Sequence, residues 1–166
     1  MKLILLSFCF LMNSFTLTEL PIWFIKSFNN KKLNERYAII NPKFLEADFN
    51  GDKIQDIAVQ VIDKRSKKKG ILIINGGTNK HCIFGAGFKF AGDDFNDTNW
   101  LDGWRLYKAK VAYETTFNAD GDIKGSRKVK ISHPAISIYS LQDGSEIAGA
   151  LIYWDGKNYV SIHQGE

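Results

Sequence analysis

The sequence predicts a mainly β protein, a small antiparallel sheet domain of hairpins with a C-terminal meander. Two observations support this fold class. Runs rich in β-branched residues occur at residues 57–62 and 70–75, as expected for strands. Asp-Gly steps separate the apolar runs of the C-terminal half, at residues 120–121, 143–144 and 155–156, and such steps are typical of tight hairpins.

The size and composition of the chain fit one globular domain. The chain has 166 residues, of which 45% are hydrophobic and 13% aromatic, enough to bury a core and to exclude intrinsic disorder. The formal charge is only +4, and a cluster of basic residues lies at 64–69. We interpret this cluster as the solvated tip of a hairpin. A nucleic-acid or anionic-glycan patch is disfavoured, because backbone binding needs a wider basic face.

The first 18 residues have the pattern of a secretory signal peptide. Lys2 precedes an apolar run at residues 3–12, which is too short to span a bilayer. Cleavage before Glu19 would leave residues 19–166 as a single β-rich domain without a membrane span. An uncleaved anchor or a buried helix is the alternative. We therefore expect an exported protein, periplasmic or secreted, in which Cys82 has no partner for an internal disulfide and is a buried, inert thiol.

The remaining elements follow from local patterns. A short helix is predicted near residues 24–36, with a loop joined to an extended arm as the alternative. Strands are predicted at residues 57–62, 70–75, 105–116, 127–132, 135–141, 146–154 and 158–163. The first two of these strands are apolar on both faces, so we expect them to be central in a sheet that is covered on both sides.

An oxygen-rich loop at residues 48–56 is the clearest candidate site. Oxygen-bearing side chains stand at alternating positions, on Asp48, Asn50, Asp52 and Asp56, and a curled loop would turn them towards one centre. The carbonyl of Ile54 could join them. Calcium takes about six to eight oxygen ligands, so these groups and one or two waters would complete its shell. A metal-free turn rich in Asp and Asn is the alternative.

The loop resembles a known type of calcium loop. An EF-hand is excluded because its twelfth position must be Glu, and Val59 stands there. The pattern is instead similar to the D-x-(D/N)-G-D-G-x-x-D loop of FG-GAP and VCBS repeats, over residues 44–61 only. Lys53 replaces the glycine of the family, which adds a steric cost. A single such unit does not make a complete propeller.

A second candidate site lies in the irregular segment at residues 93–104. Its members are acidic residues interleaved with tryptophans: Asp93, Asp94, Asp97, Asp102, Trp100 and Trp104. Carboxylates beside aromatic rings are typical of glycan sites. In the alternative, the aspartates cap turns and the tryptophans anchor the segment to the core.

These features favour an exported, non-enzymatic, calcium-binding structural or interaction domain. The chain contains no nucleotide-binding fingerprint and none of the usual hydrolase or metalloprotease motifs. A carbohydrate-binding module or glycosidase using residues 93–104 is the alternative. The partner would be a protein or a glycan.

Overall fold

A computed structural model describes residues 19–90 and 95–165 of the chain. The predicted signal peptide, residues 1–18, lies outside the described residues. In chain order the elements are α1 (Ile22–Asn30), α2 (Leu33–Arg36), β1 (Tyr37–Ala47), β2 (Asp56–Asp63), β3 (Lys69–Ile74), β4 (His81–Gly85), β5 (Gly103–Tyr107), β6 (Val111–Phe117), β7 (Ile123–Lys130), β8 (Ala135–Gln142), β9 (Ser145–Trp154) and β10 (Tyr159–Gly165).

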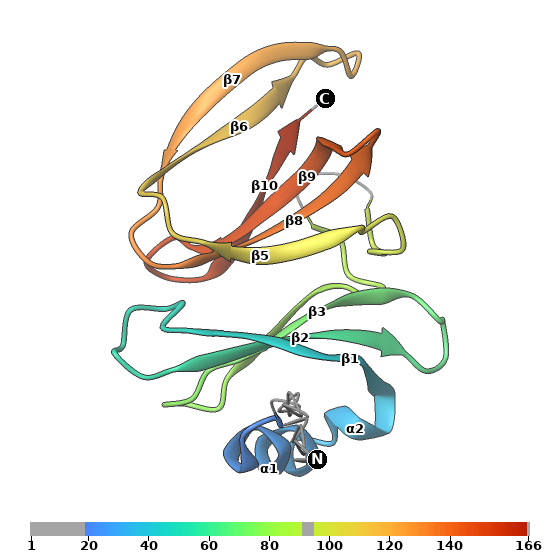
Figure 1. Ribbon diagram of the computed structural model, residues 1–166, viewed down its shortest axis with the longest axis vertical. Coiled ribbons are helices and arrows are strands. Elements are labelled where there is room, and N and C mark those ends of the chain that lie inside the picture. The colour runs from blue at the N-terminus through green and yellow to red at the C-terminus, as the bar shows by residue number, and fades with distance from the viewer. Residues whose placement is uncertain (1–18, 91–94, 166) are drawn as a thin grey trace, which may run out of the picture.

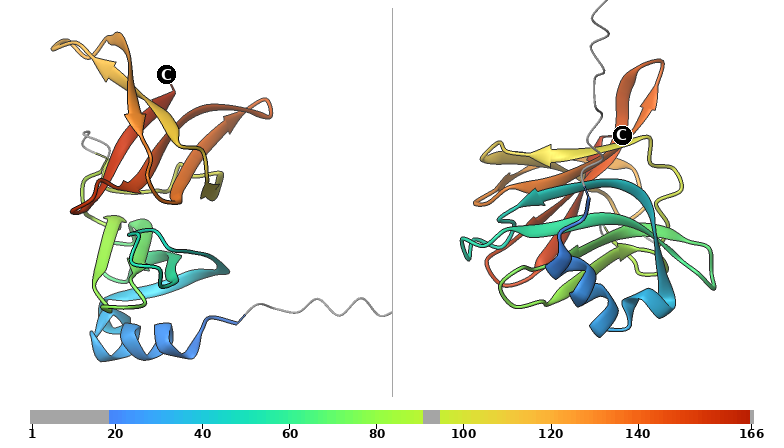
Figure 2. Two further views of the ribbon diagram at one scale, coloured as in Figure 1. Left: turned by 90° about the vertical axis from the view of Figure 1, so that its left-hand side faces the viewer. Right: turned by 60° about the horizontal axis from the view of Figure 1, so that its bottom comes forward.

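The elements are stacked in layers along the long axis of the molecule (Figures 1 and 2). The two helices lie under one face of a sheet of order β1-β2-β3-β4, and a second sheet of order β10-β9-β8-β5 lies over the other face. The β6–β7 ribbon covers part of the far face of the second sheet. All pairings are antiparallel, which confirms the predicted fold class.

Strands β2 and β3 are the central strands of the first sheet, as their apolar sequences predict. Successive residues of a strand point to opposite faces. Accordingly, Ala58 belongs to the apolar cluster between the two sheets, whereas Ile57 and Val59 belong to the cluster between the first sheet and α1. All three side chains are completely buried. Because both faces of β2 are covered, its two ends are held firmly in place.

The predicted helix near residues 24–36 is present as two short helices. Phe24 and Phe28 lie one helical turn apart in α1 and bury their stacked rings under the first sheet. The helical conformation is interrupted between α1 and α2, where Lys32 has a left-handed φ of 55°. Helix α2 ends at Arg36, and β1 begins at the next residue. This junction places Arg36 beside the end of β2, where its side chain pairs with Asp63.

The C-terminal meander of β8, β9 and β10 is confirmed. In the β8–β9 turn, Asp143 and Gly144 both have positive φ, 52° and 80°, the conformation that a tight hairpin requires. In the β9–β10 turn, Oδ1 of Asp155 accepts hydrogen bonds from the backbone N–H groups of Lys157 and Asn158. Asp-Gly steps therefore specify these turns through local chemistry.

One predicted strand is wrong. Residues 105–116 do not form a continuous strand but divide into β5, which pairs with β8, and β6, which pairs with β7. The chain turns away from the sheet between Tyr107 and Val111, and the Tyr107 hydroxyl braces this turn by donating to the Val111 carbonyl at 2.6 Å. Strand β4, which pairs with β3, was not among the predicted strands.

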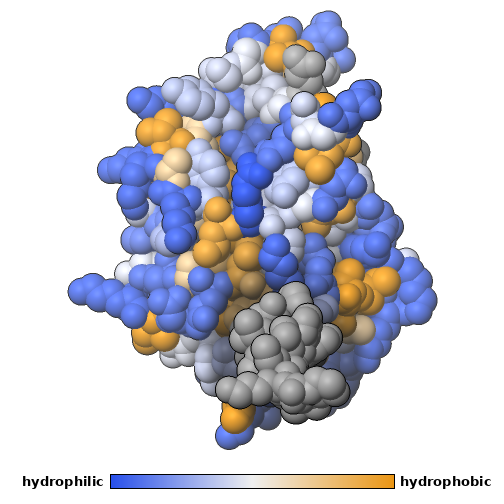
Figure 3. Space-filling model, in the orientation of Figure 1, coloured by the Kyte–Doolittle hydropathy of each residue, from blue (hydrophilic) through white to orange (hydrophobic). Residues whose placement is uncertain are grey.

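The surface is mixed in character. On the face in Figure 3, hydrophobic residues gather in small groups separated by hydrophilic ones. Strand β7 is exposed along most of its length and carries Lys124, Arg127, Lys128 and Lys130. Lysine and arginine on an edge strand disfavour pairing with the edge of another chain.

Candidate functional site

The oxygen-rich loop connects β1 to β2 at one end of the first sheet. Its residues differ greatly in burial: Asp56 is completely buried, Asp48 and Asn50 are half-buried, and Asp52 and Ile54 are exposed. Four of the five predicted ligand residues therefore lie at or near the surface. The fifth, Asp56, is the first residue of a core strand.

Two left-handed residues give the loop its curl. Gly51 has φ of 81° and Lys53 has φ of 69°. A Cβ atom on Gly51 would come within 2.2 Å of the His133 ring, so glycine is needed there both for the backbone conformation and for space. Lys53 adopts a left-handed φ despite its side chain. A lysine at this position, where the similar calcium loops have glycine, therefore does not prevent the loop from curling.

Asp48 ties the middle of the loop to its start. Its Oδ1 accepts a hydrogen bond from the N–H of Gly51 at 2.6 Å, and its Oδ2 accepts one from the N–H of Lys53 at 2.9 Å. Each of these bonds satisfies a backbone donor that the left-handed turn leaves without a ladder partner. The Asp48 carboxylate thus stabilises the curl.

Asn50 and Asp52 continue this pattern one step further. Asn50 Oδ1 accepts from the N–H of Asp52 at 2.9 Å, and Asp52 Oδ1 accepts from the N–H of Ile54 at 2.8 Å. The Asn50 amide donates to Asp52 Oδ2 at 3.2 Å. Such bonds, from a side-chain oxygen to a backbone N–H two residues on, define Asx turns. The loop is therefore closed by its own side chains.

Asp56 is the hub that joins the loop to the rest of the molecule. Its Oδ2 accepts from the N–H groups of Phe49 and Asn50 at 2.9 and 3.3 Å, and its Oδ1 accepts from the N–H of Gly76 in the β3–β4 turn at 3.1 Å. The Tyr159 hydroxyl lies 3.3 Å from Asp56 Oδ2 and 3.0 Å from Asn75 Oδ1. Since Tyr159 opens β10, this contact links the two sheets.

Burial governs the acid–base behaviour of this hub. Desolvation raises the pKa of Asp56, and the N–H groups of Gly76, Phe49 and Asn50 oppose the rise by stabilising the carboxylate. The pKa of Tyr159 is also raised, first by burial and then by the negative charge of Asp56. The phenol therefore stays protonated, and its single O–H can donate either to Asn75 Oδ1 or to Asp56 Oδ2.

The fit of the loop to calcium differs along its length. A carboxylate oxygen has two lone-pair directions. Each oxygen of Asp48 and Asp52 accepts one hydrogen bond and so keeps capacity for a cation. Asp56 Oδ2 already faces three donors and keeps none. Among residues 19–90 and 95–165, no three His, Cys, Asp or Glu side chains are grouped to hold a metal ion, so calcium binding stays a prediction.

The acidic residues of the second candidate site bond to backbone groups. Asp97 Oδ1 accepts from the N–H groups of Lys69 and Asn99 at 2.9 and 3.0 Å. Asp102 Oδ2 accepts from the N–H of Leu141 at 2.7 Å. These carboxylates attach the segment to β3 and β8. Asp93 and Asp94 lie outside the described residues.

The two tryptophans of this segment have different surroundings. Trp104 is 4% exposed and packs between the sheets. Trp100 is half-buried and lines an apolar pocket of about 240 Å³ together with Phe90 and Phe95. The structure therefore does not place the two tryptophans on one open surface. Trp100 is the member that a small ligand could reach.

Several residues that organise the loop could not be found from the sequence. A weak signal existed for Gly76, which follows an apolar strand. No signal pointed to Tyr159, because it lies 103 residues from Asp56 in the chain. Cys82, predicted to be buried, is half-buried. Burial raises the pKa of its thiol, which disfavours the nucleophilic thiolate.

The comparisons with known proteins gave no match. No protein-family model matches the chain, and neither the search of curated proteins nor that of solved structures found a similar protein. Within the described part of the chain, the helices are all too short or too polar to cross a membrane.

Proposed function

We propose that this chain is an exported, non-enzymatic structural or interaction domain, and that calcium bound by the 48–56 loop stabilises it. The observation that carries the proposal is the hydrogen-bonding of Asp56, which joins the loop to the β3–β4 turn and to β10. Any ligand that fixes the loop would therefore also fix the junction of the two sheets. The loop acts as structural support and not as a reaction centre.

The geometry also favours particular ligands within the loop. Asp48, Asn50 and Asp52 would hold the ion with their side-chain oxygens, and Ile54 with its carbonyl oxygen. Bound calcium would neutralise the two carboxylates at the rim of the loop, which otherwise repel each other. Asp56 could join these ligands only through Oδ1, which accepts one hydrogen bond, because its Oδ2 faces three donors from the protein itself.

The non-enzymatic part of the proposal rests on how the aspartates are used. Carboxylates that accept backbone N–H bonds serve as caps of turns and loops. This arrangement holds for the described aspartates of both candidate sites, namely Asp48, Asp52, Asp56, Asp97 and Asp102. A general acid instead needs a carboxyl group that reaches a substrate.

Thermal unfolding with and without calcium tests the proposal. A ligand that binds only the folded state stabilises it by about 2.7 kcal/mol when its free concentration is about 100 times Kd. We expect calcium to raise the melting temperature and EDTA to reverse the rise. Asp52→Ala should abolish the response, whereas Asp120→Ala, in the exposed β6–β7 turn, should retain it. Identical wild-type melting curves in calcium and in EDTA would remove the ion from the proposal.

A carbohydrate-binding role is the second candidate, favoured by the aromatic pocket around Trp100. Rings of Phe95 and Trp100 lie 6.4 Å apart between centroids, and aromatic faces stack on sugar rings. A glycan array tests this role. Binding that is lost in Trp100→Ala and kept in Trp23→Ala would support it, and absence of binding by the wild-type protein would reject it.

A further inference from the structure

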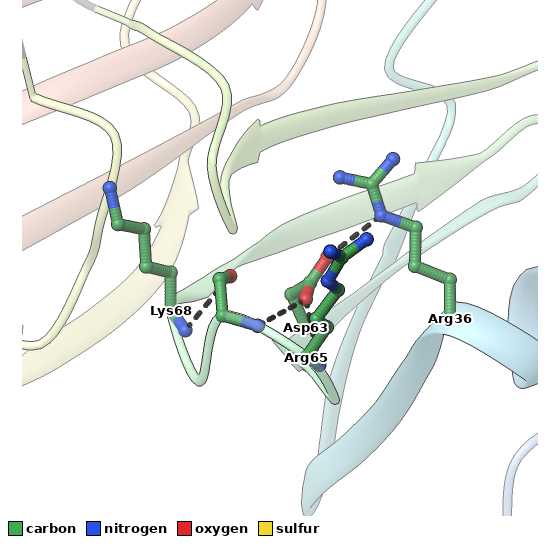
Figure 4. A network of polar contacts seen from close by, with 5 residues as sticks. Arg36, Asp63, Arg65 and Lys68 are labelled. Atoms are coloured by element: carbon green, nitrogen blue, oxygen red, sulfur yellow. Dashed lines mark hydrogen bonds and ion pairs between the residues drawn. The ribbon is translucent and has the colours of Figure 1, made fainter.

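A basic cleft lies at the end of β2 opposite to the oxygen-rich loop. Its volume is about 830 Å³, and its lining comes from three separate segments: Arg36, Asp63, Arg65, Ser66, Lys68 and Gly87. Figure 4 shows Arg36 approaching Asp63 from the helical side, Arg65 beside Asp63, and Lys68 on the other side of the turn with its side chain extending away from Arg36 and Arg65. The cleft thus contains three cationic side chains and one carboxylate.

Arg36 is held in a fixed orientation. Its Nε donates to Asp63 Oδ2 at 2.7 Å, and its guanidinium carbon lies 5.0 Å from the ring centroid of Tyr37 and 5.2 Å from that of Phe88. Two aromatic contacts and a charged hydrogen bond restrict a side chain that would otherwise be flexible. The side chain nevertheless remains 54% exposed, and the bond to Asp63 uses only Nε, so the Nη groups remain available as donors.

Both oxygens of Asp63 are bonded within the protein. Its Oδ1 accepts from the N–H groups of Arg65 and Ser66 at 2.9 and 2.8 Å, and its Oδ2 accepts from Arg36. The side chain is only 5% exposed. The negative charge of Asp63 therefore organises the turn and orients Arg36. Among the described residues that line the cleft, Asp63 is the only acidic one, so Arg65 and Lys68 have no carboxylate of their own there.

The side chain of Lys68 is also held in place by a hydrogen bond. Its Nζ donates to Asn96 Oδ1 at 2.7 Å, and the N–H of Gly87 donates to the backbone carbonyl of Asn96 at 2.8 Å. A solvated hairpin tip would leave its cations free to move apart. Here Asp63 holds Arg36 and Asn96 holds Lys68, so both cations line one cleft in fixed positions. Positive charge gathered in a cleft attracts anions.

We propose that this cleft binds a tetrahedral oxyanion, a phosphate or sulfate group, at the guanidinium groups of Arg36 and Arg65, with Lys68 adding positive charge to the cleft wall. Guanidinium groups present paired N–H donors that match the oxygens of such groups, and lysine adds a point charge. This cleft is separate from the oxygen-rich loop, which lies at the other end of β2. The two sources of this chemistry are a phosphorylated compound and a sulfated glycan.

Isothermal titration calorimetry on the full chain at low ionic strength tests the inference, with inorganic pyrophosphate and a heparin-derived hexasaccharide as probes. We expect the wild-type protein to bind at least one probe. Arg65→Gln with Lys68→Gln should weaken binding about tenfold or more. Lys124→Gln with Lys128→Gln on the β7 ribbon makes the same change in charge and should alter binding less than about twofold.

The outcomes separate the sources and the alternatives. Tighter binding of pyrophosphate identifies a phosphate site, and tighter binding of the hexasaccharide identifies a site for sulfated glycans. Failure of both probes to bind the wild-type protein overturns the inference. Equal weakening by both double variants also overturns it, since net charge alone would then explain the binding. Urea unfolding of both double variants verifies that each is folded.

Discussion

Strand β2 begins with one buried aspartate and ends with another, and the two ends differ in what compensates the buried carboxylate. Asp56 is 0% exposed and Asp63 is 3% exposed, and both accept hydrogen bonds from backbone N–H groups of the adjoining turn. Each turn contains a lysine with left-handed φ, 69° at Lys53 and 62° at Lys67. Only Asp63, however, has a cationic partner, Arg36.

This difference reverses the effect of folding on the two carboxyl groups. Burial raises the pKa of Asp56, and the neutral N–H donors of Gly76, Phe49 and Asn50 oppose this rise only in part. Arg36, aided by the N–H of Ser66, holds the pKa of Asp63 well below its usual range. A buried carboxylate can thus be retained either by several neutral donors or by one cation. The first arrangement leaves an oxygen-rich rim, and the second leaves a cleft lined by cations.

The largest effect on stability is expected from replacing Asp56, the hub at the start of β2, which we call the acidic end of the strand. Asp56→Ala would leave the buried N–H groups of Phe49, Asn50 and Gly76 without their acceptor, and each unsatisfied buried donor costs about 1–3 kcal/mol. We expect a loss of about 4 kcal/mol in the free energy of unfolding, measured by urea denaturation. The exposed Asp52→Ala is the matched control, with a loss below about 1 kcal/mol. Equal losses in both variants would contradict the role of Asp56 as a hub.

The basic end should respond less strongly, with a distinctive dependence on pH. Asp63→Asn should lower the free energy of unfolding by about 2 kcal/mol at neutral pH, because the charged bond to Arg36 is lost. The folded-state pKa of Asp63 is depressed, so its stabilisation is present above the unfolded-state pKa of about 3.9 and is lost as the pH falls towards the folded-state value. Urea unfolding from neutral to acidic pH should show wild type and variant converging in acid. A constant difference at all pH values would argue against the ion pair.

A smaller effect is expected where the acidic end contacts the second sheet. Tyr159→Phe removes the hydroxyl that is shared by Asp56 and Asn75, and a hydrogen bond of this kind contributes about 1 kcal/mol. Urea denaturation should show that loss. Tyr113→Phe is the control, because Tyr113 is 59% exposed and should change stability by about 0.3 kcal/mol or less. An unchanged free energy of unfolding in Tyr159→Phe would mean that apolar packing alone joins the two sheets.

The smallest effect, and the only gain, is expected at the two left-handed lysines. Glycine relieves the steric cost of positive φ but increases the entropy of the unfolded chain. Lys53→Gly and Lys67→Gly should each raise the free energy of unfolding by about 0.5 kcal/mol in urea denaturation. Lys53→Ala and Lys67→Ala retain a Cβ and should show no gain. A gain as large with alanine would show that the lysine charge, not φ, is the cause.

The predictable part of the fold is the part specified by local chemistry. The hairpin of β2 and β3 follows from two apolar runs around a polar turn, and the meander follows from Asp-Gly steps. The break between β5 and β6 was not predictable, since Tyr107 and Val111 both suit a strand. The break follows from the pairing of each half with a different strand, β8 for β5 and β7 for β6, and the local bond from the Tyr107 hydroxyl to the Val111 carbonyl only braces it.

The candidate sites show the same limit. Local spacing identified Asp48, Asn50 and Asp52 as a group of oxygens in one turn, and the structure keeps them in one loop. The same spacing assigned Asp56 to that group, although Asp56 is buried and its oxygens bond to the protein. Position in a motif fixes which side chains are near one another, but burial decides which of their oxygens remain available.

The sequence by itself determined a mainly β fold, the central hairpin of β2 and β3, and the acidic and basic character of the loops before and after β2. Strands and turns depend on residues close in the chain. Only the tertiary structure decided that Arg36 meets Asp63 and that Tyr159 meets Asp56, contacts that span 27 and 103 residues. Such contacts depend on how the sheets and helices pack. For this reason the same residue type, aspartate, supports an oxygen-rich loop at one end of β2 and a cationic cleft at the other.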